Sequence, residues 1–219
     1  MSEKKQTIAV IGGSGGLGSA LALRWGQAGY NIIIGSRNAE KAGIAADRLN
    51  KLMGLKTARG LSNYEAANTA EIIVLTVPFS NHMAIVEEIS VAVQAKIVVD
   101  TTVPLVPPKV SRVQLPEGGS VAKQTQEKLG KNVRVVSAFQ TISAAHLAED
   151  QQIEGEVLVC GNNVDARTCV ISLVEAAGLK GWHAGPIDNS VVSESLTPVL
   201  IFLNKRYQID GSGIRIVGH

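Results

Sequence analysis

Residues 8–18, with the sequence IAVIGGSGGLG, join a short apolar run to a glycine-rich turn. The apolar half is typical of a strand buried on both faces, and the following segment, Leu17–Gln27, is rich in helix formers. Gly13 is expected to allow the tight turn, Gly15 the approach of a pyrophosphate, and Gly18 close packing of helix on strand. Because a helix N-terminus attracts anions, the stretch predicts a dinucleotide site. An ordinary glycine-rich strand-to-helix turn is the alternative.

Further apolar runs alternate with helix-forming segments along the chain. The runs lie at residues 32–34, 72–75, 97–99, 133–136 and 157–159, and the longest early helical segments at 39–52 and 80–93. Such alternation predicts a parallel sheet covered on both faces. We therefore expect an α/β fold: a Rossmann-type doubly wound parallel sheet in residues 1–140 and a small C-terminal α/β domain in residues 141–219.

The last part of the chain carries weaker patterns. Residues 165–177 predict a helix, and Asp188–Tyr207 predicts a long helix that Pro198 kinks or divides, because proline lacks a backbone donor. Residues 109–130 contain several prolines and glycines and are expected to form an irregular loop, either a mobile cover over a site or a plain surface loop.

Composition argues against several classes of function. The chain has 219 residues, a formal net charge of +2 and 4% aromatic residues, which gives little basis for binding nucleic acid. No apolar stretch approaches the roughly 20 residues of a membrane span. The polar start reaches glycine after a few apolar residues, unlike a signal peptide, so a soluble, cytoplasmic protein is expected. Two cysteines, Cys160 and Cys169, are expected to be buried thiols.

The end of the second apolar run indicates which dinucleotide is bound. NAD-binding folds usually carry an acidic residue about 20 residues after the glycines, where it holds the ribose hydroxyls. Here Ser36 and Arg37 stand at that place, with Lys41 one helical turn later. A guanidinium, a hydroxyl and an ammonium would hold a 2′-phosphate that a carboxylate would repel. The pattern therefore predicts NADP(H) rather than NAD(H); a solvated basic helix start is the alternative.

Two further segments fall where the carboxyl edge of the sheet is expected. Val77 and Pro78 follow one run, and Val103 and Pro104 follow the next, so these residues are candidates for a rigid wall against the nicotinamide. Strand termination by proline explains the same residues. His82 is a candidate for cofactor contact or for a general acid, although a structural histidine is the alternative.

The sequence contains no convincing acid–base, nucleophilic or metal-binding constellation. The four histidines lack metal-ligand spacing, and a helix start and a polar helix face explain the candidate carboxylates Glu194 and Asp188. We therefore predict neither catalytic residues nor a metal. Hydride transfer between two redox cofactors fits this pattern, because the cofactors carry the chemistry and the protein aligns them.

These motifs resemble those of the F420-dependent NADP oxidoreductases, also called NADPH-dependent F420 reductases. The likeness rests on residues 12–18, Gly35-Ser36-Arg37 with Lys41, residues 136–138, residues 193–198, and the endings 204–207 and 213–215, so it spans essentially the whole chain. The resemblance implies reversible hydride transfer between NADP(H) and the deazaflavin coenzyme F420, with the two rings stacked between the domains. It also implies that the small C-terminal domain closes the deazaflavin pocket and contributes to a homodimer.

The resemblance also implies roles for individual residues. Those near NADP(H) would be the pyrophosphate group Ser14, Gly15, Gly16 and Leu17, the 2′-phosphate group Ser36, Arg37 and Lys41, and the nicotinamide group Val77, Pro78, His82, Val103 and Ala144. Those near the deazaflavin would be Gln140, Ser195, Thr197 and Ser212.

Gln140 departs from the pattern, since some members of the family carry a histidine there. Glutamine can donate a hydrogen bond to a ring carbonyl, but unlike histidine it cannot take up a proton or a positive charge. Two other functions stay open: an NADPH-dependent reductase of another small acceptor (imine, keto acid, flavin or metal chelate), and a non-catalytic NADP-sensing module.

Overall fold

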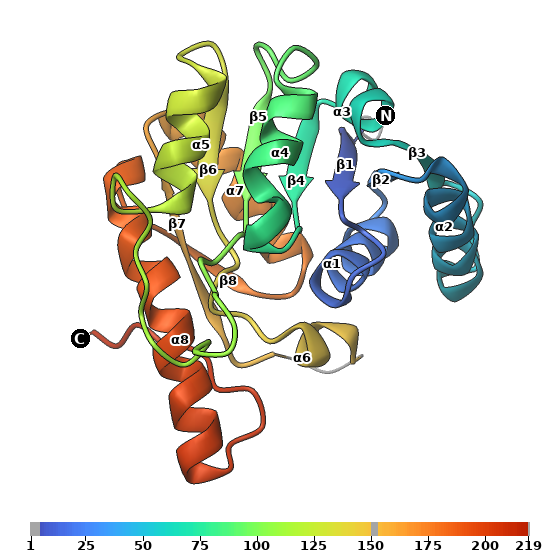
Figure 1. Ribbon diagram of the computed structural model, residues 1–219. Helices are drawn as coiled ribbons and strands as arrows, with labels where there is room; N and C mark the ends of the chain where they lie inside the picture. Colours follow the sequence, from blue (N-terminus) through green and yellow to red (C-terminus); the bar gives the residue numbers. More distant parts are fainter. Residues whose placement is uncertain (1–4, 150–152, 219) are drawn as a thin grey trace.

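The computed structural model describes residues 5–149 and 153–218 and shows one sheet of eight strands, in the order β3-β2-β1-β4-β5-β6-β7-β8. The strands from β3 to β6 in this order are parallel, which confirms the predicted Rossmann-type sheet. Figure 1 shows helices on both sides of the sheet, with α8 beside β7 and reaching below it in this view. The elements are β1 (Thr7–Ile11), α1 (Gly16–Gln27), β2 (Asn31–Ser36), α2 (Ala39–Met53), β3 (Arg59–Ser62), α3 (Asn63–Thr69), β4 (Ile72–Leu75), α4 (Phe79–Ile89), β5 (Ile97–Asp100), α5 (Val121–Leu129), β6 (Arg134–Ser137), α6 (Ala144–Ala148), β7 (Glu156–Gly161), α7 (Val164–Ala176), β8 (Lys180–His183), the 3₁₀ helix η1 (Ile187–Asn189) and α8 (Ser190–Tyr207).

The alternation of side chains along each strand divides the core into two layers. In β1, Ile8 and Val10 face one layer, which includes buried residues of α1, α2 and α7, whereas Ala9 and Ile11 face the other, with α3, α4 and α5. Both layers are apolar, so the central strands need continuous apolar runs rather than alternating ones. This explains why those runs are visible in the sequence.

The part of the chain after residue 140 continues the same sheet and core. Strand β7 pairs antiparallel with the end of β6, and β8 pairs parallel with β7. The indole of Trp25 in α1 lies at the junction, because its Nε1 donates to the Leu173 carbonyl of α7 at 2.8 Å. Its ring also makes an edge contact with Phe139, with centroids 5.9 Å apart. The two parts therefore share one apolar layer.

Several expectations about individual elements were wrong. Residues 109–130 are not wholly irregular, since α5 occupies Val121–Leu129, with the Ser120 hydroxyl accepting a hydrogen bond from Lys123 N at its start. Pro198 does not divide the last helix, because α8 runs unbroken through it. The irregular stretch is instead residues 101–120, which in Figure 1 passes in front of α8.

Candidate functional site

The glycine-rich turn leads from β1 into α1 with almost no space for side chains. Gly12, with φ of +84°, makes the turn, so this role falls to it and not to Gly13 as expected. A Cβ at Gly13 would lie 2.8 Å from Ile34 Cδ1, and one at Gly18 would lie 2.4 Å from Thr76 Oγ1, so these glycines permit close packing. A Cβ at Gly15 would meet only the Gly12 carbonyl, at 3.3 Å. The backbone at Gly15 therefore remains open to a ligand.

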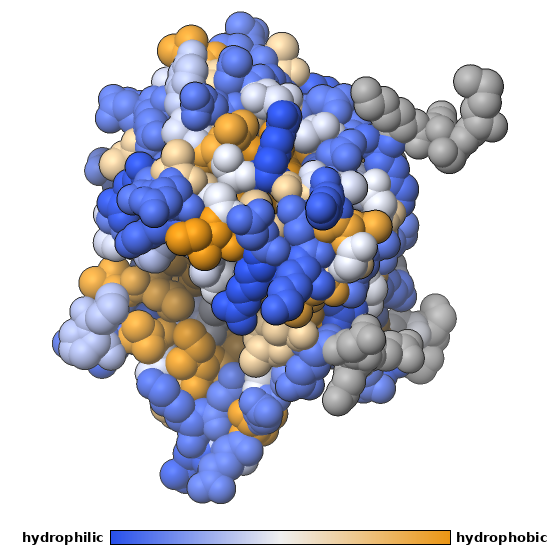
Figure 2. Space-filling view, turned by 90° about the vertical axis from the view of Figure 1, so that its right-hand side faces the viewer, coloured by the Kyte–Doolittle hydropathy of each residue, from blue (hydrophilic) through white to orange (hydrophobic). Residues whose placement is uncertain are grey.

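A cavity of about 560 Å³ lies over this turn and the carboxyl ends of the neighbouring strands. Nine of the twelve residues predicted to bind NADP(H) line it: Ser14, Gly15, Gly16, Leu17, Ser36, Arg37, Val77, Pro78 and Val103. Asn63, Asn81, Ile85 and Thr102, which were not predicted, line it too. In Figure 2 the surface is hollowed below the main body, and hydrophobic residues gather there.

Basic side chains stand at the β2 end of this cavity. Arg37 and Lys41 are exposed, and neither forms an ion pair within the described residues. Lys41 lies at the start of α2 and lines an adjacent cavity, which Ser14 also lines. Ala144, the first residue of α6, faces the glycine turn, since its Cβ would be 3.7 Å from one at Gly16. The structure thus brings the predicted phosphate-binding residues together.

His82 lies inside the protein and not among the residues lining this cavity. Its side chain is 1% exposed, and its Nε2 is 2.9 Å from Asp100 Oδ2, which also accepts a hydrogen bond from Thr125 Oγ1 at 2.6 Å. Burial opposes ionisation of Asp100, but His82, Thr125 and the Thr102 N–H outweigh it and hold its pKa below the usual range. His82 is therefore placed to support the end of β5.

A chain of hydrogen bonds connects α8 to that same strand end. Thr197 Oγ1 donates to the Gln140 carbonyl at 2.8 Å, and Gln140 Nε2 donates to the Asp100 carbonyl at 2.9 Å. Asp100 Oδ1 in turn accepts from Thr102 N at 3.0 Å, and Thr102 lines the cavity. The predicted deazaflavin residues Thr197 and Gln140 are thus joined to the predicted nicotinamide end.

Two buried polar atoms in this chain of hydrogen bonds have no partner among the residues that the structure describes. They are Gln140 Oε1 and Thr102 Oγ1. Gln140 Nε2 already donates to Asp100 and to Ser137 Oγ, so the oxygen is the atom left for a ligand. Gln140 therefore offers its Oε1 as an acceptor, and not its N–H group as a donor to a ring carbonyl, as expected from the sequence. Buried polar groups without partners are rare, and they mark places where a ligand group fits.

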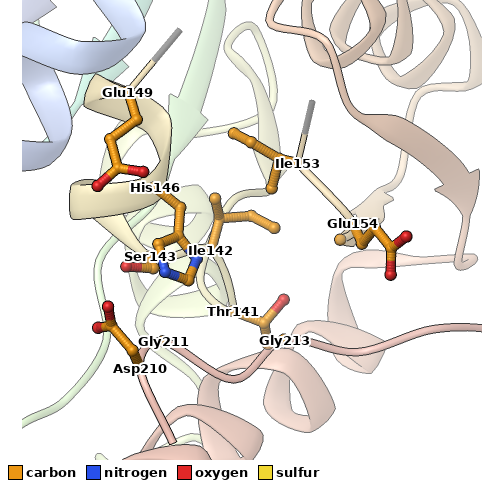
Figure 3. Close-up of a pocket in the computed structure, with 11 residues that line it drawn as sticks. Thr141, Ile142, Ser143, His146, Glu149, Ile153, Glu154, Asp210, Gly211 and Gly213 are labelled. Carbon is orange, nitrogen blue, oxygen red and sulfur yellow. The ribbon is translucent and has the colours of Figure 1, made fainter. Parts of the chain in front are cut away.

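A second cavity, of about 440 Å³, lies beside this chain of hydrogen bonds (Figure 3). Thr141, which follows Gln140, lines it, as do Gly211 and Gly213 on either side of Ser212. The Ser212 N–H donates to Asn204 Oδ1 at 2.9 Å and so fixes the loop after α8. Ser195 is half-buried on α8. Figure 3 shows carboxylates at the edge of the cavity, from Glu149, Glu154 and Asp210.

The tail of the chain is held against β7 by one carboxylate. Glu156 Oε2 accepts hydrogen bonds from Trp182 Nε1 at 2.8 Å and from Ile216 N at 2.6 Å. The backbone N–H of Glu156 also donates to the Ile214 carbonyl at 3.1 Å. The Ile216 N–H is the largest influence on the pKa of Glu156 and lowers it. The tail therefore forms a fixed continuation of the loop that borders the second cavity.

Glu194 is a functional candidate whose position the sequence analysis missed. Its side chain is completely buried and accepts hydrogen bonds from Val121 N at 2.7 Å and Ala122 N at 3.1 Å, at the start of α5. Burial raises its pKa to about 8 despite these hydrogen bonds. Glu194 therefore ties α8 to α5. No signal in the sequence distinguishes it from a glutamate on an exposed helix face.

Comparison with known proteins places this geometry in a family. Residues 7–104 match the family described as "NADP oxidoreductase coenzyme F420-dependent". An F420-dependent NADP reductase of Methanocaldococcus jannaschii is 36% identical over 95% of this chain and 97% of its own length. The chain belongs to the family of F420-dependent NADP reductases. This membership confirms the resemblance that the motifs indicated.

A second relative supports the same family, and a solved structure shares the fold. The F420-dependent NADP reductase of Methanothermobacter thermautotrophicus is 36% identical over 95% of this chain and 94% of that protein. A crystal structure from Arthrobacter sp. FB24, for which the same activity has been suggested, has a TM-score of 0.81 at 23% identity and covers 97% of this chain and 100% of that one. At that identity the likeness shows the fold alone.

The residues of this family member fit a bound NADP(H). The N–H groups of Gly12, Gly13 and Gly15 donate within the protein, but Gly16 and Leu17 begin α1 and line the cavity, where a helix N-terminus offers N–H groups to an anion. Arg37 and Lys41, which form no ion pair among the described residues, add positive charge near the same turn. Among the described residues, no helix is long and apolar enough to cross a membrane. No group of three or more His, Cys, Asp and Glu side chains there is arranged to hold a metal ion.

Proposed function

We propose that the protein transfers a hydride reversibly between NADP(H) and the deazaflavin coenzyme F420. The observation that carries this proposal is the hydrogen-bond chain from Thr197 through Gln140 to Asp100 and Thr102. It joins Thr197 and Gln140, which are assigned to the deazaflavin, to Thr102, which precedes Val103 at the proposed nicotinamide end. A protein that only senses NADP would not need such a connection to a second ligand site.

On the NADP(H) side, the glycine turn and Ser14 to Leu17 hold the pyrophosphate with the helix N-terminus. Ser36, Arg37 and Lys41 hold the 2′-phosphate, because no acidic side chain among the described residues competes for their donors. We assign the wall around the nicotinamide to Val77, Pro78, Val103 and Ala144. His82 supports that wall through Asp100 rather than by touching the cofactor.

On the deazaflavin side, Gln140, Ser195, Thr197 and Ser212 form the proposed contacts. Gln140 Oε1 accepts a hydrogen bond from a ring N–H. Thr197 Oγ1 donates its only proton to the Gln140 carbonyl, so towards a ligand this oxygen can only accept a hydrogen bond. Residues 141–219 act as the unit that closes the pocket, with α8 and the fixed tail as its walls.

Hydride transfer is the chemistry that the nicotinamide and deazaflavin rings supply when bound. The residues of the chain align the rings, exclude water and fix the carboxamide and ring N–H groups by hydrogen bonds. No side chain has to give or take a proton at the reacting atoms, which agrees with the burial of His82 away from the cavity.

We further propose a homodimer formed through the outer face of α8. Val192, Val199 and Phe202 are 51%, 43% and 54% exposed there. A contiguous exposed apolar surface commonly marks an association site. A cytoplasmic location and the absence of a nucleic-acid partner stay predictions from composition.

Stopped-flow absorbance with NADPH and oxidised F420 tests the proposed activity. We expect bleaching of the deazaflavin band in step with loss of NADPH, and a much slower reaction with NADH. NADPH binding with no bleaching would refute the proposal. Turnover of a flavin, an imine or a keto acid in its place would favour another reductase, and binding without turnover of any acceptor would favour an NADP-sensing module.

A further inference from the structure

Asn63, the first residue of α3, carries a buried acceptor that nothing in the protein satisfies. The residue is 1% exposed, it lines the cavity over the glycine turn, and its Oδ1 has no hydrogen-bond partner within the described residues. Leaving a buried carbonyl oxygen without a donor is unfavourable. Because Asn63 lines the cavity, a ligand bound there can supply the donor that this oxygen needs.

The orientation of this amide is fixed by its neighbour in α4. Asn63 Nδ2 donates to Glu88 Oε2 at 3.1 Å. A carboxylate only accepts hydrogen bonds, so the amide nitrogen has to face Glu88, and the oxygen has to point elsewhere. The unsatisfied atom is thus an acceptor, which excludes direct contact with a phosphate oxygen.

The free oxygen lies beside the end of β2. Strands β2 and β3 are in register, with Ser36 opposite Ser62, so Asn63 lies one position beyond the paired ends. A Cβ at Gly35 would lie 3.5 Å from Asn63 Oδ1, and glycine leaves that approach open. The acceptor is therefore next to Ser36 and Arg37, which stand where the 2′-phosphate of NADP(H) is proposed to bind.

We propose that Asn63 accepts a hydrogen bond from the 3′-hydroxyl of the adenosine ribose, a proposal that rests on the proposed NADP(H) site. The 3′-hydroxyl is on the carbon next to the phosphorylated one, so it is the nearest proton donor once the 2′-phosphate is held by Ser36 and Arg37. The phosphate itself has no proton to donate at neutral pH. The amino group of adenine lies at the far side of the base. Asn63 thus reads a 2′-phosphorylated ribose with a free 3′-hydroxyl.

Calorimetry with 2′,5′-ADP and its 3′-deoxy analogue tests this assignment in the intact protein. One neutral hydrogen bond predicts that the wild type prefers 2′,5′-ADP by about three- to tenfold. Asn63→Ala should bind both ligands equally. Glu87→Ala is the matched control: it removes an exposed carboxylate one position earlier on α4, which pairs with Lys128 and not with Asn63, so the orientation of the Asn63 amide is kept. It should retain the preference.

The outcomes separate this proposal from the proposed function. A preference that persists in Asn63→Ala, or that disappears equally in Glu87→Ala, overturns the role of Asn63 while NADP(H) binding stands. The inosine analogue of 2′,5′-ADP, which lacks the adenine amino group, tests contact with the base. If the wild type prefers 2′,5′-ADP over this analogue and only Asn63→Ala removes that preference, the contact is with the base and the ribose assignment is overturned. Failure of the wild type to bind 2′,5′-ADP overturns both. If Asn63→Ala does not fold, Asn63→Ser, which places a shorter polar group there, gives the same comparison of ligands.

Discussion

Arg37, directly after β2, and Lys41, in the first turn of α2, have no acidic partner among the described residues, so no ion pair there competes with a phosphate. Arg37→Glu replaces attraction by repulsion at this place. We expect NADPH affinity to fall by at least about 100-fold, since charge-assisted hydrogen bonds contribute about 1.5–3 kcal/mol before repulsion is added. NADH binding should change much less. Calorimetric titration of both nucleotides measures the difference.

Arg59→Glu provides the control for that substitution. Arg59 is exposed at the first position of β3, which is the amino end of the strand and so the opposite edge of the sheet. The same charge change there should leave NADPH affinity nearly unaltered. Equal losses in both variants would mean that the effect reflects overall charge and not a phosphate contact.

Substitution of the buried His82 tests whether this residue transfers a proton during the reaction. Since its imidazole pairs with Asp100 inside the protein, His82→Ala leaves a buried carboxylate without its partner. We expect a loss of about 3–5 kcal/mol in the free energy of unfolding, measured by urea denaturation. The pH dependence of hydride transfer should keep its wild-type form. Loss of one limb of the pH profile would instead identify His82 as a proton donor.

Single residues also show where sequence reasoning stops. Ser36 and Arg37 were predicted to contact the 2′-phosphate because the end of a strand and the absence of a carboxylate there can be read from the sequence. The burial of Glu194 and the free acceptor of Gln140 depend on which segments fold over them, and no local pattern carries that information. The turn was assigned to Gly13 because adjacent glycines look alike, whereas only Gly12 has a positive φ.

At the scale of elements, Glu194 joins α8 to the first turn of α5. Its pKa is raised from 4.5 to about 8 by burial. Between these values the folded protein retains a proton that the unfolded chain has released, so this group makes stability fall as pH rises through the window. Glu194→Gln cannot titrate and should remove that part of the pH dependence, on the order of 3 kcal/mol.

Urea denaturation at pH 5 and pH 8 measures this difference. The stability lost between the two pH values should be smaller in Glu194→Gln than in the wild type. Asp188→Asn is a suitable control, since its exposed carboxylate pairs with Lys123, which lowers its pKa and keeps it out of the window. Identical pH dependence in wild type and Glu194→Gln would show that Glu194 is ionised in the folded protein.

The elements that the sequence predicted are those in the middle of the sheet. β1, β2, β4 and β5 each contain a continuous apolar run because helices cover both of their faces. β3 and β8 escaped prediction because they lie at the two ends of the sheet, where Arg59–Ser62 and Lys180–His183 need little apolar surface. The helix α5 was hidden by the prolines and glycines that precede it.

At the scale of the whole molecule, the outer face of α8 determines the expected assembly. Phe202 is 54% exposed on this face, and a charge there would have to be buried in the proposed dimer. We expect the wild type to sediment as a dimer and Phe202→Glu as a monomer at the same concentration. Val91→Glu, at a residue 74% exposed beyond α4, should leave the dimer intact. A monomeric wild type would contradict the assignment.

The chain has two tryptophans, and they lie in different surroundings. Trp25 is fully buried between α1, α7 and Phe139, whereas Trp182 is half-buried beside Glu156, under the tail, with Lys180 Nζ 4.1 Å from its ring centre. Intrinsic fluorescence therefore contains two separable signals, a blue-shifted emission from the shared core and a red-shifted one from the tail. Replacing either indole by phenylalanine would leave a reporter that follows a single half of the molecule during ligand binding or unfolding.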